Sequence, residues 1–148
     1  MKLAIGCDHG GFDLKEALVV YLREEGHEVK DFGCYDKSSI DYPDYAIPVA
    51  EGVARGAFER GIVICTTGIG VSISANKVHG IRCALVTDEY SAKMTREHND
   101  TNVLALGANV TTMIRAKGIV DIWLEEPFSH GERHQRRIDK ISAYEKTH

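Results

Sequence analysis

Short apolar runs and amphipathic segments alternate along the whole chain. The runs at 3–7, 61–64 and 103–107 have the composition and length of strands buried on both faces. Weaker strand-like runs lie at 28–33 and 81–87. A helical pattern follows each run, and short connections between strand and helix force parallel strands with right-handed crossovers. The pattern therefore predicts an α/β fold, a three-layer α/β/α sandwich around a Rossmann-like five-stranded parallel sheet.

Local signals place some of the helix boundaries. Apolar and small residues at 71–78 indicate a helix after the third strand. Asp88 can cap the next helix, and Thr111 is expected to open the one after it. A polar last helix covers about 132–146. Without a linker, repeat or low-complexity segment, residues 1–148 are predicted to form a single domain.

The composition excludes several classes of protein. The formal net charge of −4 gives no basic footprint for nucleic acid. No apolar run approaches the length of a membrane span. Four cysteines occur without any Cys-x-x-Cys pair, which argues against a structural zinc site. The N-terminal residues enter strand-like sequence directly and lack the pattern of a signal peptide, so we expect a cytoplasmic protein with reduced thiols.

The segment 65–72, with the sequence Cys-Thr-Thr-Gly-Ile-Gly-Val-Ser, joins a predicted strand to a predicted helix. This geometry directs backbone N–H groups and the positive end of a helix dipole to one place beside the Cys65 thiol. A phosphate, a developing oxyanion or a thiolate would be stabilised there. A simpler interpretation also fits, because Gly-x-Gly turns are common and most free cysteines are small buried hydrophobes. The full dinucleotide fingerprint is absent, since Ile73 replaces its third glycine.

Polar residues are expected at the same edge of the sheet, because ligands bind at the carboxyl ends of parallel strands. Asp8 and His9 follow the first strand and suit a ligand rich in hydroxyl groups. Thr67 could relay a proton or bind a sugar oxygen. The alternative roles are a helix cap for Asp8, a loop position for His9 and a strand-end position for Thr67.

Two further groups carry candidate chemistry. His98, near the end of a predicted helix, could act as an acid or a base. Arg133 and Arg137 stand four residues apart, share one helix face and could clamp a phosphate, with His134 nearby. A solvated helix end and a solvated charged helix are the alternatives.

Taken together, the motifs resemble the RpiB/LacA/LacB family of sugar-phosphate isomerases over nearly the whole chain. The segments that carry the resemblance are 6–12 (Gly-Cys-Asp-His-Gly-Gly-Phe), 41–46 (Asp-Tyr-Pro-Asp-Tyr-Ala), 65–70, 74–77 (Ser-Ala-Asn-Lys), 98–105 (His-Asn-Asp-Thr-Asn-Val-Leu-Ala) and 131–137 (Gly-Glu-Arg-His-Gln-Arg-Arg). Each is weak alone and the combination is specific. The resemblance implies reversible conversion of ribose 5-phosphate and ribulose 5-phosphate, with no metal and no organic cofactor.

The resemblance also implies roles for particular residues. Cys65 would be the general base that removes the C2 proton, Thr67 would help to move a proton between two oxygens, and His98 would protonate the ring oxygen. Backbone N–H groups would stabilise the enediolate, as in other oxyanion holes. The remaining residues implied to bind the substrate are Asp8, His9, Thr66, Gly68, Ile69, Gly70, Asn99, Asn109, Arg133 and Arg137.

The family is dimeric, and its sites are built from both chains. By resemblance, His98, Asn99 and the last helix would come from the partner of the chain that gives Cys65, in a homodimer that either stays a dimer or pairs into a tetramer. Asn109 stands where several members place a phosphate-binding arginine. This departure keeps a hexose 6-phosphate, of allose or galactose type, as the alternative substrate.

Two other classes fit less well. A cysteine phosphatase needs Cys-x5-Arg, and Val71 occupies the arginine position. A non-catalytic nucleotide-binding module of flavodoxin-like shape would need no reactive thiol. Within the family, the runner-up is a galactose-6-phosphate isomerase subunit, which would need a second, different chain.

Overall fold

Five parallel strands form one sheet in the computed structural model, which describes residues 1–148. The strands are β1 (Lys2–Cys7), β2 (Glu28–Asp31), β3 (Arg60–Cys65), β4 (Cys83–Leu85) and β5 (Val103–Gly107), in the order β2-β1-β3-β5-β4. The chain first grows from β1 to β2 and then returns to the other side of β1. The sheet therefore reverses its direction of growth between β1 and β3, where ligands of such sheets bind.

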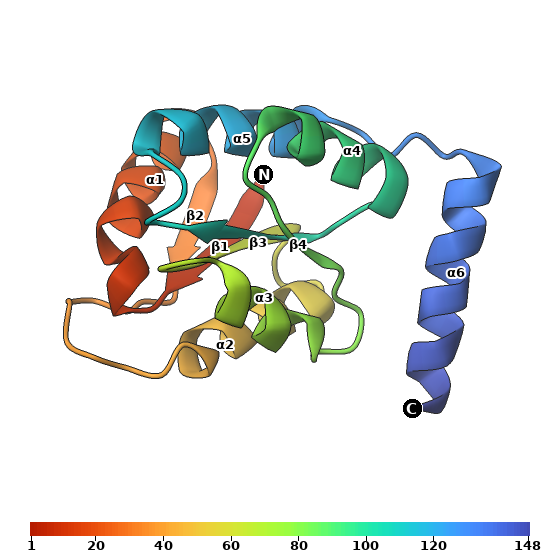
Figure 1. The fold of residues 1–148 in the computed structure, drawn as a ribbon, viewed down its shortest axis with the longest axis horizontal. Helices are drawn as coiled ribbons and strands as arrows, with labels where there is room; N and C mark the ends of the chain where they lie inside the picture. Colours follow the sequence, from red (N-terminus) through yellow and green to blue (C-terminus); the bar gives the residue numbers. More distant parts are fainter.

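Helices cover both faces of this sheet, as Figure 1 shows. Helices α1 (Phe12–Glu24), α4 (Glu89–Asn99) and α5 (Met113–Glu125) lie on one face, and α2 (Pro43–Ala54) and α3 (Ile69–Asn76) lie on the other. A 3₁₀ turn (His9–Gly11) links β1 to α1. The predicted three-layer α/β/α sandwich with a five-stranded parallel sheet is confirmed.

The alternation of strand side chains builds two separate cores. Ile62 and Ile64 of β3 point into the core beneath α1, α4 and α5. Val63 and Cys65 point into the core beneath α2 and α3. Because a strand places successive side chains on opposite faces, a strand covered on both faces must be apolar throughout. Trp123 of α5 is fully buried in the first core, so it belongs to the core of this chain.

Some element boundaries differ from the prediction. Strand β4 covers only Cys83–Leu85, because the N–H of Ile81 bonds to Val78 O and that of Arg82 to a side chain. Helix α3 begins earlier than expected, directly after Gly68. The Asp88 cap is confirmed by its 2.7 Å hydrogen bond from the Ser91 N–H.

The predicted cap of α5 was wrong by one residue. Thr112 caps the helix, since its Oγ1 accepts the Arg115 N–H at 3.3 Å. Thr111 is buried instead, and its hydroxyl oxygen has no hydrogen-bond partner. Two adjacent threonines offer the same local capping chemistry, so the sequence alone did not distinguish them.

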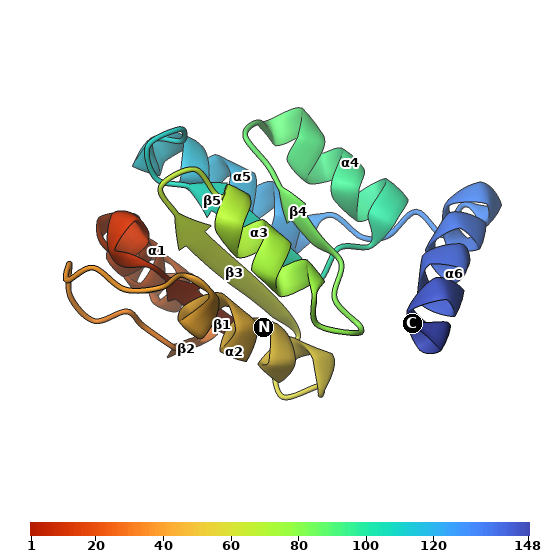
Figure 2. The same ribbon diagram turned by 60° about the horizontal axis from the view of Figure 1, so that its bottom comes forward.

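The last helix, α6 (Glu132–Thr147), stands apart from the sandwich in both views (Figures 1 and 2). Only His134 and Ile138 of this helix are buried, and its main contacts are with α4. Glu145 near its end accepts the Gly80 N–H at 2.6 Å. None of the helices combines the length and apolar character that crossing a membrane requires.

A buried lysine joins α1 to the end of β2. The Lys15 side chain is fully buried, and its Nζ lies 2.8 Å from Asp31 Oδ2 and 2.7 Å from Glu16 Oε1. Asp31 also accepts the Gly33 N–H at 2.8 Å. The ion pair therefore fixes the start of the loop that leads past His9 to α2.

We expect Lys15→Ala to destabilise the protein by about 3 kcal/mol, because it leaves a partly buried carboxylate without its partner. Urea unfolding at one protein concentration measures this. The matched control is Lys37→Ala, whose pair with Asp13 is exposed on both sides and should contribute less than about 1 kcal/mol. Equal losses in the two variants would contradict the assignment.

Candidate active site

The Cys65 thiol lies at the carboxyl end of β3, beneath the loop that leads into α3. The side chain is 5% exposed, and its Sγ accepts the Gly68 N–H at 3.1 Å. Cys65 pairs with Gly107 across the sheet. A backbone donor and the N-terminus of α3 both face the sulfur.

Several backbone N–H groups of this loop are free to bind a ligand. Those of Gly68 and Ile69 are occupied by Cys65 Sγ and Thr67 Oγ1. Those of Thr67, Gly70 and Val71 have no acceptor within the chain. The first N–H groups of a helix always lack intrahelical partners. Here they form a set of oriented donors beside a thiol, which suits an oxyanion.

Close approach of two backbones fixes the shape of the loop. Gly68 has φ +80°, in the left-handed region, and a Cβ there would lie 2.5 Å from Leu85 Cδ1. A Cβ on Gly107 would lie 2.5 Å from the carbonyl carbon and oxygen of Thr67. Both positions therefore require glycine. The end of β5 therefore packs directly against the Cys65 loop.

Asp8 and His9 stand beside this loop, as the topology predicts. Asp8 is buried and its Oδ1 accepts the Gly11 N–H at 3.1 Å, so it does cap the turn, as the simpler interpretation held. Its own N–H bonds to Ile64 O of β3. The other carboxylate oxygen of Asp8 keeps free lone pairs for a ligand.

The loop before α2 determines which ring nitrogen of His9 carries the proton in the neutral ring. Its Nδ1 lies 3.3 Å from the Ile40 N and accepts that N–H. In the neutral ring the proton is therefore assigned to Nε2. His9 thus offers an N–H donor, as recognition of an anion or a hydroxyl requires.

Thr66, Thr67, Ile69 and Asn109 lie exposed around the same loop. The Asn109 N–H donates to Thr66 O at 3.0 Å, which joins the end of β5 to the Cys65 loop. The structure thus places every predicted residue from the first strand end, the Cys65 loop and position 109 at one edge of the sheet.

The other predicted residues form a second cluster around α4 and α6. The rings of His98 and His134 stack with centroids 4.3 Å apart. Arg133 and Arg137 are exposed on the same helix as His134. Burial, followed by the charges of His98, Arg133 and Arg137, lowers the pKa of His134. The two arginines beside this pair of histidines give the cluster a positive charge, which is suited to an anion such as phosphate.

The two clusters lie at opposite edges of the sheet. Gly61, near the start of β3, donates its N–H to Asn102 O, which follows the end of α4. Cys65 lies at the other end of β3, about 13 Å further along a strand. A helix that crosses between parallel strands returns its C-terminus to the edge where the strands begin. His98 and Asn99 therefore do not meet Cys65 within one chain.

Two further residues belong to these clusters, His134, which the sequence placed only near the arginine clamp, and Tyr42, which it left without a binding role. His134 is buried against His98, and its place between Arg133 and Arg137 was the available signal. The Tyr42 ring lies against Gly70, where an added Cβ would come within 2.7 Å of it. Only the resemblance of segment 41–46 to the isomerase motif pointed to Tyr42. No group of three or more His, Cys, Asp or Glu side chains has the spacing of a metal site.

Comparison with known proteins points to one family. The model of a family described as Ribose/Galactose Isomerase matches residues 3–141. Ribose-5-phosphate isomerase B of Escherichia coli is 50% identical over 144 residues, covering 97% of this chain and 96% of the relative.

Solved structures give the same result. Ribose-5-phosphate isomerase B of Clostridium thermocellum is 52% identical, with a TM-score of 0.97 and 99% of both chains covered. The enzyme of Mycoplasma genitalium, solved with bound ribulose 5-phosphate, is 42% identical, with a TM-score of 0.93 over 98% of this chain and 96% of that one.

We expect Cys65 to be alkylated before Cys7 and Cys83, although Cys65 is buried, Cys83 is half-buried and all four thiols are free. Burial raises the pKa of Cys83 to about 12, and burial and Cys34 raise the pKa of Cys7. At pH 8 a thiol of that pKa is ionised in only about one molecule in 10⁴. A time course with iodoacetamide, read by peptide mass spectrometry, measures the order.

The matched variants for this measurement are Cys65→Ser and Cys83→Ser. The first should remove the fast labelling, and the second should leave it in place. Labelling of Cys83 ahead of Cys65 would contradict the reactivity that the loop geometry implies.

Proposed function

The chain belongs to the ribose/galactose isomerase family, and from that membership we propose that it interconverts ribose 5-phosphate and ribulose 5-phosphate through an enediolate. The observation that carries the proposal is the Cys65 thiol beneath unoccupied N–H groups of its loop. An aldose–ketose isomerase needs a base at C2 and C1 and donors for the adjacent oxygens, and this loop offers both. The relatives named above support the five-carbon substrate.

The proton transfer at carbon is assigned to Cys65. The thiolate removes the C2 proton of the open-chain aldose, and the C–H electron pair becomes the C1–C2 double bond of the enediolate. The negative charge moves to the C1 oxygen, where the free N–H groups of Thr67, Gly70 and Val71 stabilise it. Thr67 helps to move a proton from the C2 oxygen to the C1 oxygen. The thiol then returns its proton to C1, which gives the ketose.

Ring opening precedes this step, because ribose 5-phosphate is mainly a cyclic furanose. The bond between C1 and the ring oxygen breaks, His98 gives a proton to that oxygen, and the C1 hydroxyl releases its own proton to solvent water. Asp8 and Asn99 hold sugar hydroxyls, and the Nε2–H of His9 binds the phosphate with Arg133 and Arg137. Two guanidinium groups and an imidazole match the charge of a phosphate dianion.

A second copy of the chain completes each site. One chain holds Cys65 and His98 at opposite edges of its sheet, so a base and an acid for one sugar must come from two chains. Helix α6 fits this role, because most of its surface is unburied and Ile141 and Tyr144 are exposed on it. Exposed Ile69 and Ile73 of α3, next to the Cys65 loop, offer an apolar surface for the partner. We therefore assign a homodimer with shared sites.

The remaining question is the length of the sugar phosphate, and Asn109 bears on it. It is exposed beside Thr66 and offers an amide without a charge. With His9 and two arginines already assigned to the phosphate, Asn109 is expected to tune affinity rather than to create it. The similarity to ribose-5-phosphate isomerases B favours the pentose phosphate over allose 6-phosphate and galactose 6-phosphate.

The function is tested by a coupled assay of the purified chain on these three sugar phosphates. We expect turnover of ribose 5-phosphate and a loss of about 10²–10⁴-fold in Cys65→Ala, the usual contribution of a general base. Cys83→Ala is the matched thiol control and should retain turnover. Turnover of a hexose phosphate alone would change the assigned substrate. Full activity of Cys65→Ala would show that Cys65 is not the base.

The shared site is tested by pairing two inactive chains. Cys65→Ala and His98→Gln chains carrying different affinity tags are co-expressed, and the mixed dimer is isolated through both tags. One of its two sites then has both native residues, so we expect about half of the wild-type turnover per dimer. Each homodimeric variant alone is the control. A mixed dimer as inactive as the two controls would show that Cys65 and His98 act within the same chain.

A further inference from the structure

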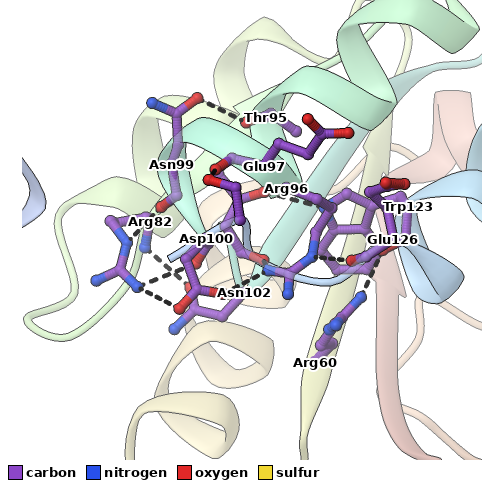
Figure 3. A network of polar contacts seen from close by, with 12 residues as sticks. Arg60, Arg82, Thr95, Arg96, Glu97, Asn99, Asp100, Asn102, Trp123 and Glu126 are labelled. Atoms are coloured by element: carbon purple, nitrogen blue, oxygen red, sulfur yellow. Dashed lines mark hydrogen bonds and ion pairs between the residues drawn. The ribbon is translucent and has the colours of Figure 1, made fainter. Parts of the chain in front are cut away.

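The turn that follows His98 and Asn99 at the end of α4 is held from several directions, as Figure 3 shows. Helix α4 ends at Asn99, and Asp100 caps it with φ +45°, in the left-handed region. That conformation costs a residue with a Cβ roughly 1 kcal/mol. A helix end also leaves its last carbonyl groups without intrahelical partners. The turn therefore depends on groups outside the helix backbone.

Arg96 supplies the first set of contacts from inside the structure. It is 5% exposed, and its Nη1 donates to Asp100 Oδ1 at 2.8 Å and to Thr101 O at 2.7 Å. Its Nε donates to Glu126 O at 3.1 Å, at the end of α5. The guanidinium of Arg96 thus ties the turn after α4 to the neighbouring helix.

Arg82 supplies the second set from the segment before β4. Its Nε donates to Asn99 O at 2.8 Å, and its Nη2 donates to Asp100 O at 3.0 Å. In Figure 3 the two guanidinium groups lie on either side of Asp100. The fixed fork of an arginine can bond two successive carbonyls, which a single ammonium group does less well.

Hydrogen bonds made by Trp123 and Arg60 support this arrangement from the interior of the protein. Trp123 Nε1 donates to Thr101 Oγ1 at 3.0 Å, and Arg60 Nη1 donates to Leu124 O at 3.2 Å. The residues that follow Asp100 are therefore fixed to α5. On the side of the turn that faces solvent, Arg82 is the residue that restricts its movement, and the Arg82 side chain is 25% exposed.

From these contacts we propose that Arg82 and Arg96 are positioning residues for the ring-opening acid His98. They bond only to backbone carbonyls and to Asp100, so they act through the turn and not on the sugar. Their effect is to hold the end of α4, and with it the imidazole that stacks on His134, in one place. This inference rests on the proposed isomerase function. A displacement of about 1 Å at a reacting group can lower a rate about 10²-fold.

The two substrates differ in whether a ring must open, and this difference distinguishes a positioning role for Arg82 from general damage to the fold. Ribose 5-phosphate must open its ring before Cys65 can act. Ribulose 5-phosphate stays open, because its C5 oxygen carries the phosphate and is not free to close a five-membered ring onto C2. Exchange of a C1 hydrogen of ribulose 5-phosphate with D₂O therefore reports the Cys65 step without ring opening.

The experiment compares Arg82→Ala with Arg23→Ala. Arg23 is the matched control, because it also donates to a backbone carbonyl, Val29 O at 2.9 Å, but lies on α1 away from His98. At saturating substrate we expect Arg82→Ala to lower turnover of ribose 5-phosphate about 10- to 100-fold and to keep deuterium exchange into ribulose 5-phosphate within about twofold of wild type. Arg82→Lys should recover part of the turnover, and Arg23→Ala should match the wild type in both assays.

A parallel fall of turnover and exchange in Arg82→Ala would overturn the proposal, since it would indicate general damage to the fold or the dimer. Unchanged turnover would overturn it as well. A wild-type protein without turnover or exchange would instead overturn the isomerase function on which the proposal rests. Arg96→Lys, made at a buried position, is the second variant and should show the same separation of the two rates.

Discussion

Parallel strands impose the constraint on which the rest of this structure depends. Every strand ends at one edge of the sheet, and every crossover helix must return to the other edge before the next strand begins. The thiol at the end of β3 and the histidine at the end of α4 are therefore separated by the length of a strand. Within one chain, therefore, the Cys65 thiol with the free N–H groups of its loop does not meet His98 with its neighbouring arginines. The proposed homodimer, with sites shared between two copies, would bring the two groups together.

Arginine has two distinct uses in this molecule. Arg82 and Arg96 are committed to carbonyl and carboxylate oxygens at the end of α4, where burial makes unpaired acceptors costly. Arg133 and Arg137 are exposed and, within the chain, have no acidic partner. After burial and His98, their charges also lower the pKa of His134, and both guanidinium groups are available to bind an anion. The contrast separates the two arginines proposed to position His98 from the two proposed to bind the phosphate.

Much of the fold and about half of the site geometry could be predicted from the sequence. Continuous apolar runs indicated strands covered on both faces, and the glycines after Cys65 indicated a loop with free N–H groups. Both signals are local, so they can be recognised in the sequence without knowledge of the tertiary contacts. The limits of β4 and the choice of Thr112 over Thr111 as a cap were missed, because neighbouring residues with equal propensities are distinguished only by which carbonyl or N–H group lies nearby.

The sequence by itself determined the alternation of strands and helices, the thiol at a strand end and the family to which these motifs belong. Only the tertiary structure decided which N–H groups stay free, because that depends on Gly107 lying against Thr67 and on Cys65 Sγ occupying the Gly68 donor. Only the tertiary structure placed two arginines on the turn after α4 and buried Lys15 against Asp31. These contacts join residues far apart in the chain, and no local pattern of residue types specifies them.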